Sequence, residues 1–333
     1  MSGNISTRHA AVKSAGQIRA EEGIAVLAGR RHALLAPRAT IALVALLRAL
    51  DLPPGSEVLL PATLCANPAH AVRLAGLCPI FADISPDTLA LDLVSAEQMV
   101  GEQTKVLLAV PLFGQGVDVE RLLDFAGRHG LIVVEDAAHA VGARYGAHRE
   151  RPAGSLGVCS IYSFGVGKIA DAGGGAALIS DAAALLERAR FYLAQLSSGQ
   201  QNLAEQAVRI LDSLRVLPFE LQSRSDMARF YRQGLDLQGI EHPQPSPLWK
   251  YSVLLPNRIE RDRLTRALLS AGVEATNLYP PLPHFFGEAR ADSRLYYPAA
   301  FDAYSRIVNL PLWPQPEGLL ESVLSAFATY RSI

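Results

Sequence analysis

Leu131-Ile132-Val133-Val134-Glu135-Asp136-Ala137-Ala138-His139 is the stretch that decides the fold class of this 333-residue chain. A short apolar run of this kind is typical of a strand buried on both faces, as in parallel sheets that are covered by helices. The run delivers Asp136 to the end of the strand. In open α/β sheets ligands bind at the carboxyl ends of strands, so Asp136 is a candidate site residue.

The same alternation of short apolar runs and helical patterns surrounds this stretch. Strands are expected at 32–36, 57–60, 78–84, 106–110, 131–134 and 176–179, and helices at 40–50, 69–75, 118–129 and 182–193. This order predicts an α/β fold with a mostly parallel sheet and helices on both faces.

The pattern changes after residue 197. Residues 203–240 are mainly helical and more charged, and a Pro-rich stretch at 242–247 precedes a strand at 250–255, a helix at 260–271 and a strand at 307–310. The sequence therefore predicts an N-terminal arm (1–30), a large cofactor-binding domain (31–200) and a smaller α+β C-terminal domain with a helical crossing segment (201–333).

Composition excludes several classes of function. The 31 basic and 32 acidic residues are interspersed, with a net charge of -1 and no long basic run, so no nucleic-acid partner is expected. The apolar stretches are strand-sized and the N-terminus lacks a secretory segment, which predicts a cytoplasmic protein without a membrane span. Three widely spaced cysteines, Cys65, Cys78 and Cys159, indicate neither a disulfide framework nor a metal site.

A glycine-rich segment carries a lysine shortly after Asp136. It reads Ser163-Phe164-Gly165-Val166-Gly167-Lys168 and is followed by Gly173-Gly174-Gly175, so backbone can approach a flat ligand closely. Gly167-Lys168 resembles the end of a nucleotide phosphate loop, but that loop needs Gly where Tyr162 stands and Ser or Thr where Ile169 stands.

Asp136 and Lys168 together fit pyridoxal 5'-phosphate. This cofactor needs a lysine for its Schiff base and a carboxylate that keeps its ring nitrogen protonated. A helix-capping aspartate and a solvated loop lysine are the ordinary structural explanations, and finding the two residues together favours the cofactor. We therefore predict Lys168 as the catalytic residue and Asp136 as a cofactor-binding residue.

The cofactor's phosphate needs an anion site. Ala39 and Thr40 lie at the start of a predicted helix, where free backbone amides and the helix dipole favour an anion, and Ser163 offers a further hydroxyl. His139, three residues after Asp136, is placed to donate a hydrogen bond to the cofactor or to stack on its ring. No Gly-x-Gly-x-x-Gly is present, so a dinucleotide site is not predicted.

Several motifs in this order resemble the DegT/DnrJ-type sugar aminotransferases, which are fold type I pyridoxal-phosphate enzymes. Besides Glu135–His139 and Ser163–Lys168, they are Gly55-Ser56-Glu57-Val58-Leu59-Leu60-Pro61-Ala62, the segment 67–83, Pro111-Leu112-Phe113-Gly114-Gln115 and Gly154-Ser155-Leu156-Gly157. The resemblance implies that Lys168 carries the cofactor and Asp136 pairs its ring nitrogen. It likewise implies that His139 lies near the cofactor hydroxyl, and that Ser163, Ala39 and Thr40 bind its phosphate.

The resemblance also implies partners and a reaction. Enzymes of this kind are homodimers with active sites at the subunit interface, and they move an amino group from glutamate to a nucleotide-linked keto sugar. Cys65 is a further predicted cofactor-binding residue, because it occupies a place where the family often has an aromatic residue that stacks on the cofactor. The family's Ser-Gly-Thr phosphate turn is Arg38-Ala39-Thr40 here, and its Gly-Tyr-Asn-Tyr-Arg segment after residue 200 is not found.

The sequence therefore does not determine which compound accepts the amino group. A cyclitol or another natural-product ketone or aldehyde is the alternative to a keto sugar. A pyridoxal-phosphate lyase, aldolase or dehydratase is a second class, although the dehydratase branch of the family replaces the lysine by His. A regulator that has lost catalysis is a third, and the retained Asp136 and Lys168 argue against it.

Overall fold

The computed structural model describes residues 13–114, 117–146, 150–197, 202–236, 249–286, 293–312, 318, 321–323 and 325–327. Its largest element is a seven-stranded sheet in the order β1-β9-β8-β5-β4-β2-β3. The strands are β1 (His32–Ala36), β2 (Glu57–Pro61), β3 (Cys78–Ala82), β4 (Thr104–Ala109), β5 (Ile132–Asp136), β8 (Cys159–Ser163) and β9 (Ala176–Ser180). All neighbours from β8 to β3 pair in parallel, and β9 runs antiparallel to both β1 and β8. The predicted mostly parallel sheet is confirmed.

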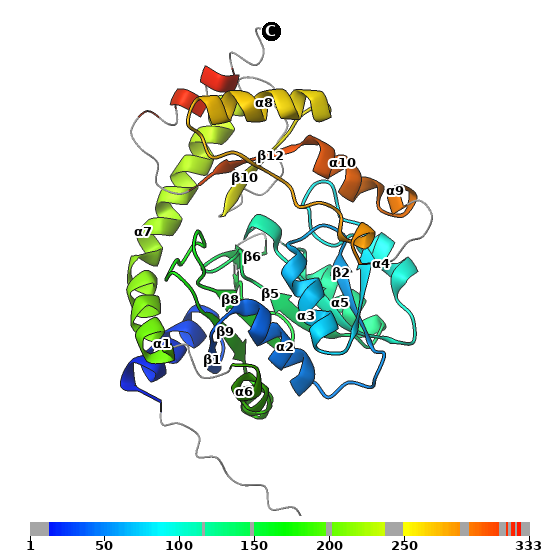
Figure 1. Cartoon of the computed structure of the whole chain (residues 1–333), viewed down its shortest axis with the longest axis vertical. Coiled ribbons are helices and arrows are strands. Elements are labelled where there is room, and N and C mark those ends of the chain that lie inside the picture. The colour runs from blue at the N-terminus through cyan, green and yellow to red at the C-terminus, as the bar shows by residue number, and fades with distance from the viewer. Residues whose placement is uncertain are drawn as a thin grey trace, which may run out of the picture.

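Helices cover both faces of this sheet (Figure 1). They are α1 (Ala15–Leu27), α2 (Ala39–Ala49), α3 (Ala66–Leu74), α4 (Leu93–Met99), α5 (Val119–Arg128) and α6 (Ala183–Leu196). In β4, Val106 and Leu108 join the core under α2, α3 and α6, whereas Leu107 and Ala109 join the core under α4 and α5. Successive strand residues point to opposite faces, so two helical layers bury most residues of the strands.

A long helix leads from the large sheet to a smaller one. It is α7 (Leu203–Asp236), which packs against α1 and in Figure 1 runs along one side of the molecule up to the small sheet. The small sheet is antiparallel in the order β10-β12-β11. Its elements and neighbours are β10 (Lys250–Leu254), β11 (Thr276–Asn277), β12 (Ile307–Pro311), α8 (Arg258–Ser270), α9 (Ser293–Tyr296) and α10 (Pro298–Arg306). The expected Pro-rich stretch at 242–247 lies outside the described residues, and the domain boundary at residue 201 stays a prediction.

The C-terminal part packs over the carboxyl ends of β2 and β3. The Leu282 amide donates to the Ala62 carbonyl at 2.8 Å, just after β2. The Asp83 carboxylate, just after β3, accepts from the amides of Ala299 and Ala300 at 2.9 and 2.8 Å and so caps α10. These contacts place the loop around Tyr279 beside the end of the large sheet where ligands are expected.

Strand β8 was not predicted from the sequence, because Ser160 and Ser163 interrupt its apolar pattern. Ser160 is fully buried, and its hydroxyl donates to Glu135 at 2.9 Å. A polar residue can therefore occupy a central strand when the fold supplies an acceptor for it. The short strands β6 (Arg144–Tyr145) and β7 (Arg151–Pro152) were likewise not predicted.

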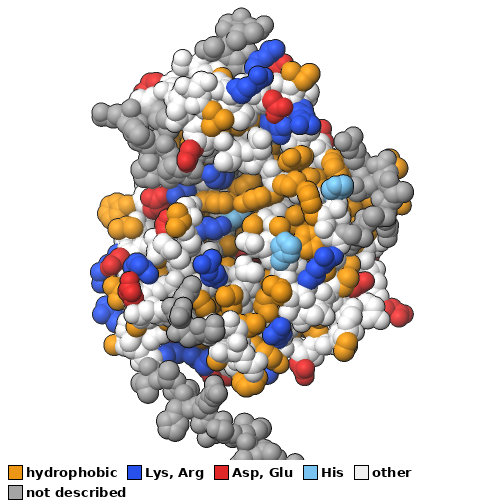
Figure 2. All heavy atoms as spheres, in the orientation of Figure 1, with side chains coloured by type: hydrophobic (Ala, Val, Ile, Leu, Met, Phe, Trp, Pro, Cys, Tyr) orange, Lys and Arg blue, Asp and Glu red, His pale blue; other side chains and the backbone are white. Residues whose placement is uncertain are grey.

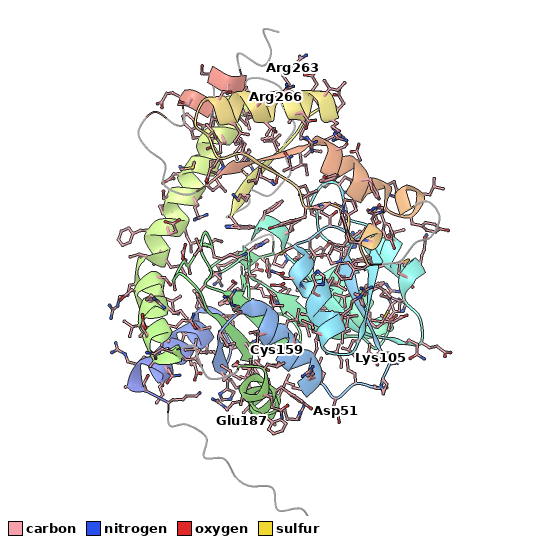
Figure 3. The ribbon with its side chains drawn as sticks, viewed as in Figure 1. Asp51, Lys105, Cys159, Glu187, Arg263 and Arg266 are labelled. Carbon is pink, nitrogen blue, oxygen red and sulfur yellow. The ribbon has the colours of Figure 1, made fainter. Side chains whose placement is uncertain are left out.

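The cysteines differ in their surroundings. Cys159 is fully buried in the core shared by the sheet with α2 and α6 (Figure 3), and burial raises the pKa of its thiol to about 12. Cys78 is exposed and Cys65 is half-buried. Within the described ranges no helix is long and apolar enough to cross a membrane.

Candidate active site

One cavity lies at the carboxyl ends of the parallel strands and the start of α2. It encloses about 620 Å³, including the open space at its mouth. Its lining residues are Ala39, Thr40, Leu43, Leu64, Cys65, Asn67, Pro68, Val110, Leu112, Asp136, Ala138, His139, Ser163 and Lys168. All seven residues predicted from the sequence are among them, although they span 130 positions of the chain.

Asp136 is the last residue of β5 and carries a carboxylate at the base of this cavity. Its Oδ1 accepts a hydrogen bond from the Ala138 amide at 3.1 Å. Burial raises its pKa, whereas that hydrogen bond and the charge of Lys168 act in the opposite direction. A buried carboxylate of this kind is stabilised by a cationic partner, so the site favours a ligand that brings a protonated nitrogen.

Lys168 lies in the loop after β8, and its amine is unusually easy to deprotonate. Burial lowers its pKa to about 8, and the negative charge of Asp136 opposes that shift. Near neutral pH an appreciable fraction of this lysine is therefore the neutral amine that attacks carbonyl groups.

Asp171 holds the loop that carries Lys168. Its carboxylate accepts from the amides of Gly167 and Gly173, both at 2.7 Å. Gly167 has φ +77°, a conformation that glycine adopts without strain. Asp171 was not predicted from the sequence, although an aspartate two residues before a glycine is a known turn signal.

The start of α2 faces the cavity with its amides unused by any side-chain cap. Arg38 occupies the N-cap position with extended backbone and makes no capping hydrogen bond. The first amides of an α-helix have no partner within the helix, and the helix dipole adds positive potential there. The Thr40 and Ser163 hydroxyls line the same cavity, so the donor set suits a phosphate group.

His139 is buried at the side of the cavity and is held in its neutral form. Burial lowers its pKa well below the usual range, and the charges of Lys168 and Lys250 lower it further. The Phe113 amide donates to its Nδ1 at 3.4 Å, which leaves the ring proton on Nε2 as a donor.

Aromatic rings from three distant segments surround His139. Trp249 is closest, with ring centroids 3.8 Å apart, followed by Phe113 at 6.1 Å and Tyr279 at 6.4 Å. Burial raises the pKa of the Tyr279 hydroxyl out of the physiological range. Trp249 was not predicted from the sequence, since no local pattern links it to His139, which lies more than 100 positions away.

Glu135 fixes the position of Asp136 from the opposite face of β5. This side chain is fully buried, and its carboxylate accepts from Tyr145, Gly154, Leu156 and Ser160. Burial raises its pKa, and these hydrogen bonds counteract the rise. The Gly154–Gly157 motif is thus part of the support of the site: a Cβ on Gly157 would stand 2.0 Å from the Val133 carbonyl oxygen of β5.

The residues present fit pyridoxal 5'-phosphate. The cavity combines an amine of lowered pKa, a buried carboxylate that needs a cationic partner, a neutral imidazole and an uncapped helix start with two hydroxyls. Among the described residues, no cluster of three or more His, Cys, Asp or Glu could hold a metal ion.

Comparisons with known proteins agree with this chemistry. The family model described as "DegT/DnrJ/EryC1/StrS aminotransferase family" matches residues 16–319. GDP-perosamine synthase of Caulobacter vibrioides is 30% identical over 283 residues, covering 79% of this chain and 76% of that protein. UDP-N-acetyl-3-dehydro-α-D-glucosamine 3-aminotransferase of Acidithiobacillus ferrooxidans is 29% identical over 326 residues, covering 93% of this chain and 86% of that protein.

Solved structures match over nearly the whole chain. S. venezuelae DesV, solved in complex with a ketimine intermediate, superposes with a TM-score of 0.85 at 27% identity, covering 97% of this chain and 91% of that one. The two chains therefore share one fold along almost their full length.

Proposed function

Because the chain belongs to the DegT/DnrJ/EryC1/StrS aminotransferase family, we propose that it uses pyridoxal 5'-phosphate to move an amino group from glutamate to a nucleotide-linked keto sugar. The observation that carries this proposal is the single cavity that unites Lys168, Asp136 and the uncapped start of α2. The similarity to GDP-perosamine synthase and to the UDP-sugar aminotransferase supports the nucleotide-linked acceptor.

Each residue of the cavity has a definable task in this reaction. When bound, the cofactor supplies an aldehyde that an amine can attack and a protonated ring that withdraws electrons. The Asp136 carboxylate keeps that ring protonated, and the amides at Ala39 and Thr40 with the Ser163 hydroxyl hold its phosphate. His139 donates from Nε2 toward the ring substituents, because its Nδ1 is already engaged with Phe113.

Lys168 is the residue that moves protons. Its pKa of about 8 lets the same nitrogen, Nζ, take up a proton from the substrate carbon and return it within one cycle. The walls of the cavity are largely apolar, among them Leu43, Leu64 and Val110, and they keep water away from that nitrogen.

The proposal includes a cytoplasmic homodimer. Val166, two residues before Lys168, is 81% exposed, and α7 exposes Phe219 by 80% and Val216 by 58%. Figure 2 shows hydrophobic side chains gathered across the middle of the face in view, and such patches mark interaction surfaces. The thiol of Cys65 in the cavity suits a reducing compartment. Sedimentation analysis of the purified chain tests the dimer, and a monomer at all concentrations contradicts it.

Cofactor attachment tests the assignment of Lys168. Purified protein with pyridoxal 5'-phosphate turns yellow, and borohydride fixes the cofactor on the peptide that contains Lys168. Lys250 is the matched control, because it is a second buried lysine whose pKa burial lowers to about 8. Lys168→Ala abolishes the fixed adduct and Lys250→Ala retains it. An adduct that persists in Lys168→Ala contradicts the assignment.

The reaction is tested in two halves. Glutamate bleaches the yellow protein and releases 2-oxoglutarate, after which a nucleotide-linked keto sugar restores the colour and is aminated. Bleaching without release of a keto acid indicates a lyase instead. Restoration by a cyclitol ketone but not by any nucleotide-linked sugar moves the acceptor to the alternative class.

A further inference from the structure

Trp249 lies against two side chains of the cavity, those of His139 and Lys168. Its ring centroid is 3.8 Å from that of His139, and the Nζ of Lys168 lies 4.3 Å from the centroid of the Trp249 ring. An ammonium within about 6 Å of an indole face is attracted by the negative potential of the ring. The tryptophan thus contacts Lys168 directly, although it belongs to the segment that enters the small sheet.

The position of the indole is fixed at both of its ends. Its Nε1 donates to the Gly167 carbonyl at 2.6 Å, which is the residue just before Lys168. Its backbone amide donates to the Phe113 carbonyl at 3.0 Å, next to His139. The ring is therefore tied to the lysine loop on one side and to the wall of the cavity on the other.

We propose that Trp249 is a positioning residue that holds the ammonium form of the Lys168 side chain on its indole face whenever that side chain is free. This inference rests on the proposed function, because the amine of Lys168 must be released and recaptured in each cycle of an aminotransferase. While the amine is free, it needs a fixed position from which it can reach the substrate carbon. An indole face supplies such a position without a competing hydrogen bond.

The contact also explains how Lys168 keeps some basicity in an apolar cavity. Burial alone favours the neutral amine, whereas the indole face and Asp136 favour the ammonium. Without the indole face the pKa of Lys168 should fall further, by about one unit. Lys250 allows a comparison within the same protein. Its Nζ lies 5.6 Å from the centroid of the same ring, and the charge of Lys168 is one of the causes that lower its pKa.

Tryptophan fluorescence tests the contact without any catalysis. The chain contains two tryptophans, so Trp313→Phe leaves Trp249 as the sole emitter. In this background, and with the full-length chain free of cofactor, the emission should change with a midpoint near pH 8. Because Lys250 also lies near this ring and has a similar pKa, it is first replaced by Met, and the transition that remains is assigned to Lys168. Adding Lys168→Met to Lys250→Met should remove that remaining transition. An emission of Lys250→Met that does not change with pH, or a transition that survives in the double variant, overturns the proposal.

The pH profile of the reaction tests the positioning role. In Trp249→Leu, the pH profile of the glutamate half-reaction should give an apparent pKa for Lys168 that is lower by about one unit. The maximal rate constant of that half-reaction should fall about tenfold. Trp249→Phe keeps an aromatic face and should restore most of the profile. A Trp249→Leu profile equal to that of the unaltered enzyme overturns the role. If the protein catalyses no half-reaction with glutamate, the fluorescence titration still shows whether Trp249 contacts Lys168. A failure of the proposed function can therefore be distinguished from a failure of the proposed contact.

Discussion

Glu135→Gln tests how the fold holds Asp136 at the base of the cavity. Glu135 is the neighbour of Asp136 in β5 and is fully buried. Its carboxylate accepts hydrogen bonds from four groups, namely the Tyr145 hydroxyl (2.8 Å), the Gly154 amide (3.0 Å), the Leu156 amide (2.9 Å) and the Ser160 hydroxyl (2.9 Å). Any change at Glu135 therefore acts on β5 and on the loop between β7 and β8.

The cost of the glutamine can be worked out from this geometry. The amide oxygen of the glutamine can take the place of Oε2 and keep the hydrogen bonds from both backbone amides and from the Ser160 hydroxyl. Its NH2 group then faces the Tyr145 hydroxyl, which can rotate to accept a hydrogen bond from it. The four hydrogen bonds no longer involve a charged acceptor, which weakens each by about 1 kcal/mol. Part of this loss is offset, because the glutamine removes the cost of burying a charge. We expect the free energy of unfolding to fall by about 2 kcal/mol, or the melting temperature by about 3 °C for a chain of this length.

Glu135→Ala should be far more damaging. It leaves the Tyr145 hydroxyl and the amides of Gly154 and Leu156 buried without an acceptor. Ser160 can still donate to the Leu156 carbonyl at 3.1 Å. Three orphaned donors at about 1–3 kcal/mol each approach the whole stability of a typical domain.

Urea unfolding followed by circular dichroism measures both variants, with Ser160→Ala as the control that should cost about 1 kcal/mol or less. Glu135→Gln should also bind the cofactor more weakly, because Asp136 moves with the strand. The reasoning is refuted if Glu135→Ala unfolds at the urea midpoint of the unaltered chain, or if Ser160→Ala costs as much as Glu135→Ala.

Three further outcomes follow from the site and its supports. In its proposed role Lys168 attacks the cofactor only as the neutral amine. The rate of cofactor capture, measured by stopped-flow absorbance, should therefore rise about tenfold per pH unit up to about pH 8 and then level off; a flat profile contradicts this. Asp136→Asn keeps the bond to the Ala138 amide but removes the charge, so cofactor affinity measured by equilibrium titration should fall roughly 10–100-fold, and unchanged affinity would exclude a charged partner for Asp136. Asp83→Ala removes the cap of α10 and should lower the free energy of unfolding by about 1–2 kcal/mol in urea titrations; an equal midpoint would show that the cap contributes nothing.

Local patterns in the sequence predicted a large part of the site. The apolar run before Asp136 defines a buried strand, and the end of such a strand lies at the ligand-binding edge of a parallel sheet. The glycines around Lys168 and the helix starting at Ala39 are equally local signals. All seven predicted residues line one cavity, because parallel strands bring their carboxyl ends to the same edge. Their individual roles stay predictions.

Tertiary structure alone decided which residues support this chemistry. Trp249 reaches Lys168 only because the chain crosses along α7 and returns over the end of the large sheet, and no periodicity records such a return. In the sequence Glu135 is only the residue that follows an apolar run. Its role depends on hydrogen-bond donors that lie 10 to 25 positions further along the chain. Periodicity determines which face a residue occupies, whereas contacts between distant segments depend on how whole elements pack. The sequence by itself determined the fold class and indicated the cofactor, and the packing of the C-terminal part decided what surrounds the lysine.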